Sequence, residues 1–382
     1  MPDAVERLAE AVRDAAARGA RLAPRGAGHW WTEAAAGAAA LDCTLTSGVC
    51  RIDAADLVAT AGGGCALAAL DAALAAQGVW LALDPPGPSQ RTVGSALAAG
   101  GAGPLAAGFG PPRDQVLGMT FVAGNGTIAH TGGRVVKNVA GFDLAKLIVG
   151  SHGAFGVIAQ AHLRLRARPA ADLTRAWTLA QGPDVAVRRL MAAGAMPAAF
   201  EVVDPPLARA LGLATQWTLL LRAMGTAEGV EEELEAAAAA LLDCGAAPVS
   251  APEDVWARWR LAVGAWPAIL RIGADPDSWH AAAALAAALP LALGTSATVP
   301  RGTVRAGYER LPAETARALR SACRDRGWPV TLERADAATR EVIGVWGAMD
   351  AGARRLAADL RRVFDPNGVF DVPLWADGPA DR

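Results

Sequence analysis

The sequence predicts an α+β protein, and three observations favour this class. Residues 3–18 carry apolar side chains at helical spacing, whereas residues 21–24 and 57–61 are the apolar runs of short strands. The turn Gly124-Asn125-Gly126 separates two further strand-like runs and predicts an antiparallel hairpin. After residue 170, strand-like runs alternate with alanine-rich helices, which predicts a second α+β domain.

Length, composition and charge exclude several classes of protein. The chain has 382 residues, 53% hydrophobic and 19% charged, so it is long enough for two or three domains with buried cores. Its formal net charge is −2, without the basic surplus that nucleic-acid-binding proteins carry. The N-terminus has no apolar signal-peptide core, and glycine or proline interrupts the uncharged stretches 92–112 and 278–300. We therefore expect no nucleic-acid partner and no transmembrane segment.

The cysteines predict reduced thiols rather than a metal or iron–sulfur centre. An odd number without a secretion signal is typical of the cytoplasm. The five cysteines are Cys43, Cys50, Cys65, Cys244 and Cys323. None of them belongs to a CxxC pair or to a Cys/His cluster with zinc spacing. We predict that the chain holds no metal.

Glycines mark the ends of the elements expected in the N-terminal part. Gly19 ends the first helix. Leu67 and Leu74 mark a second helix, which Gly78 closes. Residues 85–110 are so rich in Gly, Pro and Ala that we expect little regular structure there.

A change of sequence pattern at Arg168-Pro169 predicts a domain boundary near residue 170. Beyond it we expect strands at 176–179, 199–203, 217–221 and 268–272, and helices at 228–242 and 277–289. An amphipathic helix is expected over residues 351–364, followed by the turn Asp365-Pro366-Asn367-Gly368. The predicted domains are therefore residues 1–169, residues 170–350 and a returning tail, residues 351–382.

The loop Arg25-Gly26-Ala27-Gly28-His29 follows a predicted strand. Consecutive N–H groups in such a glycine loop can form a nest for an anion such as phosphate. The loop lacks the third glycine of the Rossmann fingerprint, and taken alone it fits an ordinary turn better. No P-loop occurs, and the run Val149-Gly150-Ser151-His152-Gly153 lacks the first glycine of a nucleophile elbow.

Residues 132–147 contain both lysines of the chain, Lys137 and Lys146. In a sequence that otherwise uses arginine, this suggests that an ammonium group matters there. A solvated helix start explains the same residues equally well.

Several of these motifs together resemble the FAD-binding subunits of bacterial glycolate oxidases, within the vanillyl-alcohol-oxidase-like flavoproteins. The most specific stretch is GGRVVKNVAGFDLAKLIVGSHGAFGVI, residues 132–158. Residues 53–60, residues 67–86 and Thr92-Val93-Gly94 also match. The resemblance covers residues 1 to about 168 closely and returns at Phe364-Asp365-Pro366-Asn367-Gly368-Val369-Phe370.

The resemblance implies a two-subdomain FAD-binding fold of the vanillyl-alcohol-oxidase type, divided at about residue 60, with residues 170–350 as an α+β cap on the substrate side. FAD would be gripped by the glycine loop and by three later segments. The residues implied are Arg25, Gly26, Ala27, Gly28, His29, Thr92, Gly94, Ser95, Ala98, Gly103, Gly108, Arg113, Asp114, Gly153, Gly156, Val157 and Ile158. In related flavoproteins a histidine at the place of His29 can be bonded to the flavin, but for this chain we favour noncovalent packing.

The function that the resemblance implies is that of an FAD-binding subunit in a glycolate (2-hydroxy-acid) oxidase or dehydrogenase complex. Glycolate would be oxidised to glyoxylate by hydride transfer to flavin N5. The partners would be a second flavoprotein subunit and an iron–sulfur subunit, in the cytoplasm or at the inner membrane through those partners. A noncatalytic electron-transfer or structural subunit and a stand-alone FAD-dependent alcohol oxidase are the alternatives.

No residue of the sequence stands out as the catalytic base. Arg222 and Arg271 follow strand-like runs, and a guanidinium suits a substrate carboxylate. For either arginine alone, a surface salt bridge is the better explanation.

Overall fold

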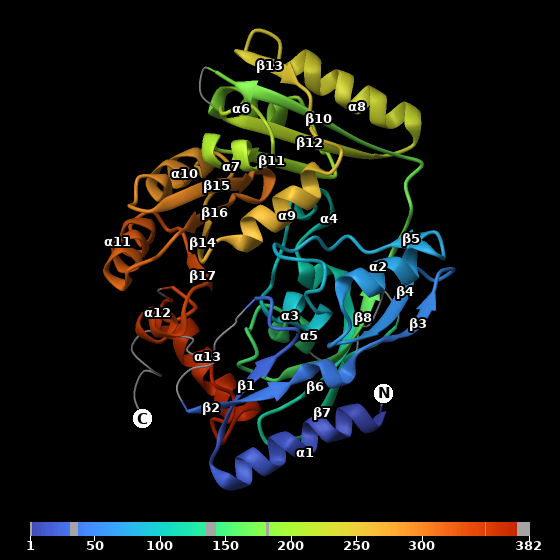
Figure 1. Ribbon diagram of the computed structural model, residues 1–382, viewed down its shortest axis with the longest axis vertical. Coiled ribbons are helices and arrows are strands. Elements are labelled where there is room, and N and C mark those ends of the chain that lie inside the picture. The colour runs from blue at the N-terminus through green and yellow to red at the C-terminus, as the bar shows by residue number, and fades with distance from the viewer. Residues whose placement is uncertain (1, 31–36, 135–142, 181–182, 348, 373–382) are drawn as a thin grey trace.

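The computed structural model describes residues 2–30, 37–134, 143–180, 183–347 and 349–372. Figure 1 shows two main parts, with an eight-stranded sheet above and a five-stranded sheet below. Trp31, Lys137 and the last ten residues of the predicted tail lie outside the described residues. No described helix is both long and apolar enough to span a membrane.

The N-terminal part starts with helix α1 (Pro2–Arg18), which buries Leu8 and Val12 and ends before Gly19 at φ +62°. Strand β1 (Arg21–Arg25) follows and pairs in parallel with β2 (Ala38–Asp42). The glycine loop therefore begins where β1 ends, as the sequence predicts.

This part contains an antiparallel sheet of five strands in the order β3-β4-β8-β6-β7. The strands are β3 (Val49–Asp53), β4 (Val58–Gly62), β6 (Val116–Val122), β7 (Ile128–Gly132) and β8 (Val157–Arg164). Strands β6 and β7 form the predicted hairpin, with Gly126 at φ +77° in its turn. Because β4 pairs with β8, the sheet does not divide at residue 60.

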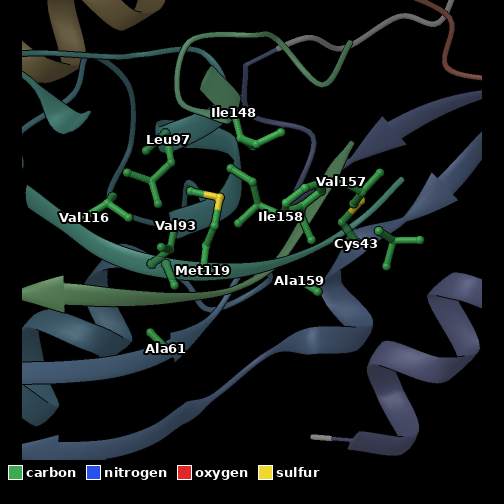
Figure 2. Close-up of a cluster of buried hydrophobic side chains, with 14 of the residues drawn as sticks. Cys43, Ala61, Val93, Leu97, Val116, Met119, Ile148, Val157, Ile158 and Ala159 are labelled. Carbon is green, nitrogen blue, oxygen red and sulfur yellow. The ribbon is translucent and has the colours of Figure 1, made fainter. Parts of the chain in front are cut away.

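The short helices α2 (Leu67–Ala75), α3 (Val93–Ala98) and α5 (Leu144–Ile148) pack against strands of this sheet. Helix α4 (Ala106–Phe109) instead packs against β11 (Ala199–Val203) of the eight-stranded sheet. The expectation of little regular structure in 85–110 is wrong for α3 and α4. These helices are too short to show a 3.6-residue period, and tertiary packing stabilises them. Figure 2 shows Val93 and Leu97 of α3 packed with Met119 of β6 and Ile158 of β8 in the buried core.

The middle part is built on an antiparallel sheet of eight strands in the order β13-β10-β12-β11-β15-β16-β14-β17. They are β10 (Ala171–Leu179), β11 (Ala199–Val203), β12 (Thr218–Gly225), β13 (Ala246–Val249), β14 (Ala268–Gly273), β15 (Ala292–Thr298), β16 (Thr303–Tyr308) and β17 (Val330–Arg334). Each predicted strand overlaps one of them. A small pairing of β5 (Val79–Trp80) with β9 (Arg166–Ala167) precedes this sheet along the chain.

Both faces of the eight-stranded sheet are covered by helices. Alternate residues of β14 enter different cores, Leu270 on one face and Ile269 on the other. The helices are α6 (Pro183–Ala192), α7 (Pro205–Ala210), α8 (Ala227–Ala240), α9 (Val255–Ala265), α10 (Trp279–Ala287) and α11 (Ala313–Arg324). Helix α9 meets the N-terminal part, where the amide of Gly87 donates to the carbonyl of Arg260 over 2.8 Å.

The end of the chain returns to the N-terminal part through α12 (Ala337–Ile343) and α13 (Ala351–Phe364). The buried carboxylate of Asp365 accepts from the amides of Val369 and Phe370 over 2.7 and 3.0 Å. This turn places Phe370 beside Leu22 of β1. Figure 1 accordingly shows α13 next to β1 and β2.

Glu201 of β11 is an acid buried within the eight-stranded sheet, with 0% exposure. Its carboxyl group accepts hydrogen bonds from Ser296 and Thr298 of β15. Burial raises the pKa of Glu201 to about 7, above its ordinary value of 4.5. The native state therefore holds a proton that the unfolded chain releases as the pH rises from 4.5 to 7.

We expect the free energy of unfolding to fall across that pH window, because ionised Glu201 is costly in the core. The loss is about 3 kcal/mol. Glu201→Gln, whose amide does not ionise, removes this pH dependence, whereas the exposed control Glu228→Gln keeps it. Urea unfolding at pH 4.5 and pH 7.5 measures the change in the free energy of unfolding between the two pH values. An equal change in wild type and Glu201→Gln would contradict the raised pKa of Glu201.

Candidate functional site

A cavity with about 700 Å³ of empty space, open to solvent, lies where four glycine-bearing segments of the N-terminal part meet. We call it the loop cavity. Its lining comes from the end of β1, the β4–α2 turn, α3 and the start of β8. The lining residues are Pro24, Arg25, Gly26, Gly28, His29, Trp30, Cys43, Gly63, Thr92, Gly94, Ser95, Ala98, Ala99, His152, Gly153, Gly156, Val157 and Ile158.

The glycine loop presents backbone amides to this cavity. Within the described part of the chain, no group accepts a hydrogen bond from the amides of Gly26, Ala27, Gly28 or His29. Gly28 has φ +74°, and a Cβ added there would meet nothing within 4 Å. Consecutive unpaired amides beside open space form a nest that suits a phosphate or another anion.

The cavity depends on backbone segments that approach too closely for side chains. A Cβ on Gly63 would lie 2.0 Å from the carbonyl oxygen of Ile158, and one on Gly26 would lie 2.3 Å from Oγ1 of Thr92. The amide of Gly94 donates to the carbonyl of Gly63 over 2.7 Å. These contacts bring the β4 turn, α3 and β8 together around one space.

The indole of Trp30 forms one wall of the loop cavity, and the guanidinium of Arg91 lies against it. The guanidinium of Arg91 lies 3.9 Å from the ring centroid of Trp30 and donates to the carbonyl of Pro86 over 2.9 Å. Burial lowers the pKa of Arg91 to about 9, so it remains protonated at neutral pH. Nε1 of Trp30 is buried and has no hydrogen-bond partner among the described residues. Both features fit a flat, polar ligand beside the indole.

His152 also lines this cavity, although no site residue was predicted there. It is 8% exposed and adopts φ +56°, a left-handed conformation between Gly150 and Gly153. Burial, with the charge of Arg271 adding to it, lowers the pKa of His152 to about 3. The imidazole is therefore uncharged at neutral pH. The sequence offered one signal for this site residue. His152 lies between Gly150 and Gly153 in the run 132–158, the stretch most specific to the family that the chain resembles.

A second cavity, with about 770 Å³ of empty space including its open mouth, lies between the two parts. We call it the arginine cavity. The N-terminal part contributes residues of the α3–α4 region and the middle part contributes β14–β16. The lining residues are Gly100, Ala102, Gly103, Ala106, Pro111, Pro112, Arg113, Val149, Arg271, Thr298, Arg301, Thr303 and Arg305.

One buried carboxylate organises the arginines of the middle part. Arg271 of β14 lies directly opposite Arg305 of β16 in the strand pairing, which would be repulsive by itself. Glu333 of β17, 2% exposed, lies 2.8 Å from Nε of Arg271 and binds Arg305 through two hydrogen bonds of 2.8 and 3.2 Å. Burial opposes ionisation, but the two arginines together lower the pKa of Glu333.

The two cavities are neighbours. Ala99 lines the loop cavity and the next residue, Gly100, lines the arginine cavity. On the other side of this boundary, the amides of Gly150 and His152 donate to the carbonyls of Leu97 and Ala98 over 3.0 and 2.8 Å. A ligand in one cavity is therefore separated from the other by little more than one layer of backbone.

The structure gathers most of the predicted cofactor-binding residues, but not all. Twelve of them line the loop cavity, namely Arg25, Gly26, Gly28, His29, Thr92, Gly94, Ser95, Ala98, Gly153, Gly156, Val157 and Ile158. Gly103 and Arg113 line the arginine cavity instead. Gly108 packs on Ala198, and Asp114 lies beside Gly110. Ala27 belongs to the loop without lining either cavity.

The two candidate arginines have different surroundings. Arg222 is bound by Asp172 through two hydrogen bonds of 2.7 and 2.6 Å and lines neither cavity, which fits the salt-bridge explanation. Arg271 lines the arginine cavity. Lys146 is exposed and forms an ion pair with Asp143 over 3.1 Å. Within the described residues, no three His, Cys, Asp or Glu side chains are grouped to hold a metal ion.

Comparison with known families identifies the ligand of the N-terminal part. A family model described as an FAD binding domain matches residues 1–132. The chain contains an FAD-binding domain. FAD is therefore the cofactor, and the amide nest, the glycine contacts and the indole wall of the loop cavity are features that fit it.

The chain is also similar to curated FAD-linked oxidoreductases. It is 39% identical over 135 residues to glycolate oxidase subunit GlcE of Escherichia coli, covering 35% of this chain and 39% of that protein. It is 31% identical to glycolate oxidase subunit GlcD of Bacillus subtilis, over 49% of this chain and 42% of that protein. The chain thus spans about two fifths of the length of these relatives.

Solved structures extend the likeness to the whole fold. A 4-ethylphenol oxidase from Gulosibacter chungangensis aligns with a TM-score of 0.72 at 15% identity, covering 96% of this chain and 86% of that chain. An alkyldihydroxyacetonephosphate synthase aligns with a TM-score of 0.67 at 16% identity, covering 96% and 73%. The fold is that of the vanillyl-alcohol-oxidase type, as the sequence predicts.

The contact between Gly63 and Ile158 can be tested by substitution. We expect Gly63→Ala to destabilise the protein by about 2 kcal/mol and to lower its FAD content, because the new methyl group overlaps a backbone carbonyl. Gly133→Ala is the matched control, since a Cβ there meets nothing within 4 Å. Thermal unfolding and flavin absorbance per chain measure both effects, and wild-type values for Gly63→Ala would contradict the packing argument.

Proposed function

We propose that this chain is the FAD-binding subunit of a 2-hydroxy-acid oxidase or dehydrogenase complex, with glycolate as the simplest substrate and glyoxylate as its product. In this proposal the backbone amides of the loop Arg25–His29 hold the pyrophosphate of FAD. Thr92, Gly94, Ser95 and Ala98 lie along the flavin and phosphates, while Gly153, Gly156, Val157 and Ile158 lie near the adenosine half. Gly103, Gly108, Arg113 and Asp114 belong to a second loop on the flavin side.

The observation that carries the proposal is the boundary shared by the loop cavity and the arginine cavity. A dehydrogenase of this kind needs its flavin within reach of the substrate α-carbon. A cavity lined by guanidinium groups next to the FAD cavity provides a place for the carboxylate of a 2-hydroxy acid. The relatives named glycolate oxidase subunits support the same substrate class.

FAD supplies N5 as the acceptor of the hydride from the substrate α-carbon. The residues of the chain bind and orient the substrate. Arg271 and Arg305 bind the carboxylate, and Glu333 holds both guanidinium groups in place. His152, at the boundary between the cavities, is uncharged, and in this proposal it accepts a hydrogen bond from the substrate hydroxyl.

Partner subunits form part of the proposal. GlcE and GlcD are named as subunits of glycolate oxidase, so we propose a second flavoprotein subunit and an iron–sulfur subunit as partners of this chain. These would place it in the cytoplasm or at the inner membrane. If the partners alone held the substrate site, this chain would be an electron-transfer or structural subunit.

Anaerobic reduction tests the activity. We expect the flavin of the purified chain, identified as FAD by chromatography after heat release, to bleach when glycolate or D-lactate is added without oxygen. Arg271→Gln should bleach at least about tenfold more slowly, because a charged hydrogen-bond partner of the carboxylate is lost. Arg222→Gln, outside both cavities, is the matched control. Bleaching only after addition of the partner subunits would instead support the electron-transfer role.

The attachment of FAD is tested separately at His29, which lies at the rim of the loop cavity. We expect acid precipitation to leave a colourless pellet and free FAD in the supernatant, because packing in the cavity is noncovalent. A yellow pellet whose colour is lost in His29→Ala would show a covalent bond to this imidazole and overturn the expectation.

A further inference from the structure

We infer that the substrate taken by the arginine cavity carries two anionic groups, as a 2-hydroxy dicarboxylate does, and that Arg301 binds the second of them. This inference rests on the proposed function, which it narrows from 2-hydroxy acids in general to those with a second anion. The evidence is the charge of the cavity, its open space and the placement of its arginines on different elements.

Among the described residues, the lining of the cavity holds four arginines and no aspartate or glutamate. Glu333 is shared between Arg271 and Arg305, so this group of three side chains keeps one positive charge. Arg301 forms no ion pair within the described residues, so its guanidinium adds a second positive charge to the cavity. In the part of the chain that the structure describes, the ion-pair partner of Arg113 is Asp114, at a distance of 4.0 Å. One monocarboxylate would leave at least one of these charges uncompensated.

The positive charge is divided between two places. Arg305 is buried at 1% exposure and, with Arg271 and Glu333, forms a rigid group on neighbouring strands of the sheet. Arg301 is exposed and lies in the turn between β15 and β16, held there by the short helix Val299–Arg301. A ligand anchored by Arg271 and Arg305 therefore meets a second guanidinium at the mouth of the cavity.

The size of the cavity points in the same direction. Its empty space of about 770 Å³ includes the open mouth, so the cavity admits an acid longer than two carbons. Thr298 and Thr303 add hydroxyl groups to the lining. A longer acid with anions at both ends can reach the buried arginines and Arg301 at the same time, whereas glycolate engages only one of them.

Binding of unreactive acids to the oxidised holoprotein tests the inference without turnover. Succinate and glutarate represent dianions, and propionate and butyrate represent monoanions of similar length. We expect isothermal titration calorimetry at low salt to show dissociation constants at least about tenfold lower for the dianions, because they form an additional charged hydrogen bond. Equal dissociation constants for dianions and monoanions would overturn the inference.

Two variants assign the second anion to its residue. Arg301→Gln should reduce the preference for dianions to near unity. Arg310→Gln, an exposed arginine just after β16 that lies outside the cavity, should keep the wild-type preference. An unchanged preference in Arg301→Gln would overturn the role of this arginine.

Anaerobic reduction separates this inference from the proposed function. We expect D-malate and D-2-hydroxyglutarate to bleach the flavin at lower concentrations than glycolate and D-lactate. Bleaching by glycolate with no preference for the dicarboxylic acids would overturn the inference and leave the proposed function standing. Tight binding of succinate with no bleaching by any 2-hydroxy acid would overturn the proposed function and leave the anion site standing.

Discussion

The architecture of the N-terminal part depends on the close approach of the β4 turn to β8. The amide of Gly63 donates to the carbonyl of Ala159 over 2.8 Å, and its Cα faces Ile158 at a distance that excludes a methyl group. Gly94 then bonds to Gly63 and sets the start of α3. Because every side chain is excluded from these contacts, the backbone itself surrounds the loop cavity. The same packing joins Ile158 to the core drawn in Figure 2, so that core stability and cavity shape depend on the same residues.

The middle part holds charged groups in a sheet that is buried on both faces. Paired arginines opposite each other are tolerated because Glu333 lies between them. Glu201 is accommodated by two hydroxyl donors and by a raised pKa, so it carries little charge in the acidic range. Buried ions need partners to offset lost hydration. The arginine cavity is therefore a place where the sheet keeps positive charge that its own residues do not fully compensate.

Sequence patterns predicted the elements well where periodicity or turn chemistry is strong. Strand β11 and helix α13 begin and end at the predicted residues, and the hairpin turn at Gly124-Asn125-Gly126 is confirmed. Helices α3 and α4 were missed because four to six residues are too few for a helical repeat of apolar side chains to be recognised. The glycine loop was placed correctly after β1, although by itself it fitted an ordinary turn better. Its unpaired amides indicate an anion site only because β8 and α3 form the other side of the cavity.

The sequence by itself determined the α+β class, because periodicity and turn chemistry are local. Its resemblance to FAD-binding subunits predicted twelve of the residues that line the loop cavity. Tertiary structure alone decided which charges meet. Glu333 and Arg305 are 28 residues apart, and Arg271 joins them only because β16, β14 and β17 are neighbours in the sheet. His152 became a site residue for the same reason, since its surroundings include Arg271 from the other part of the chain. Spacing along the chain carries no information about which strands pair, and the electrostatics of both cavities follow from that pairing.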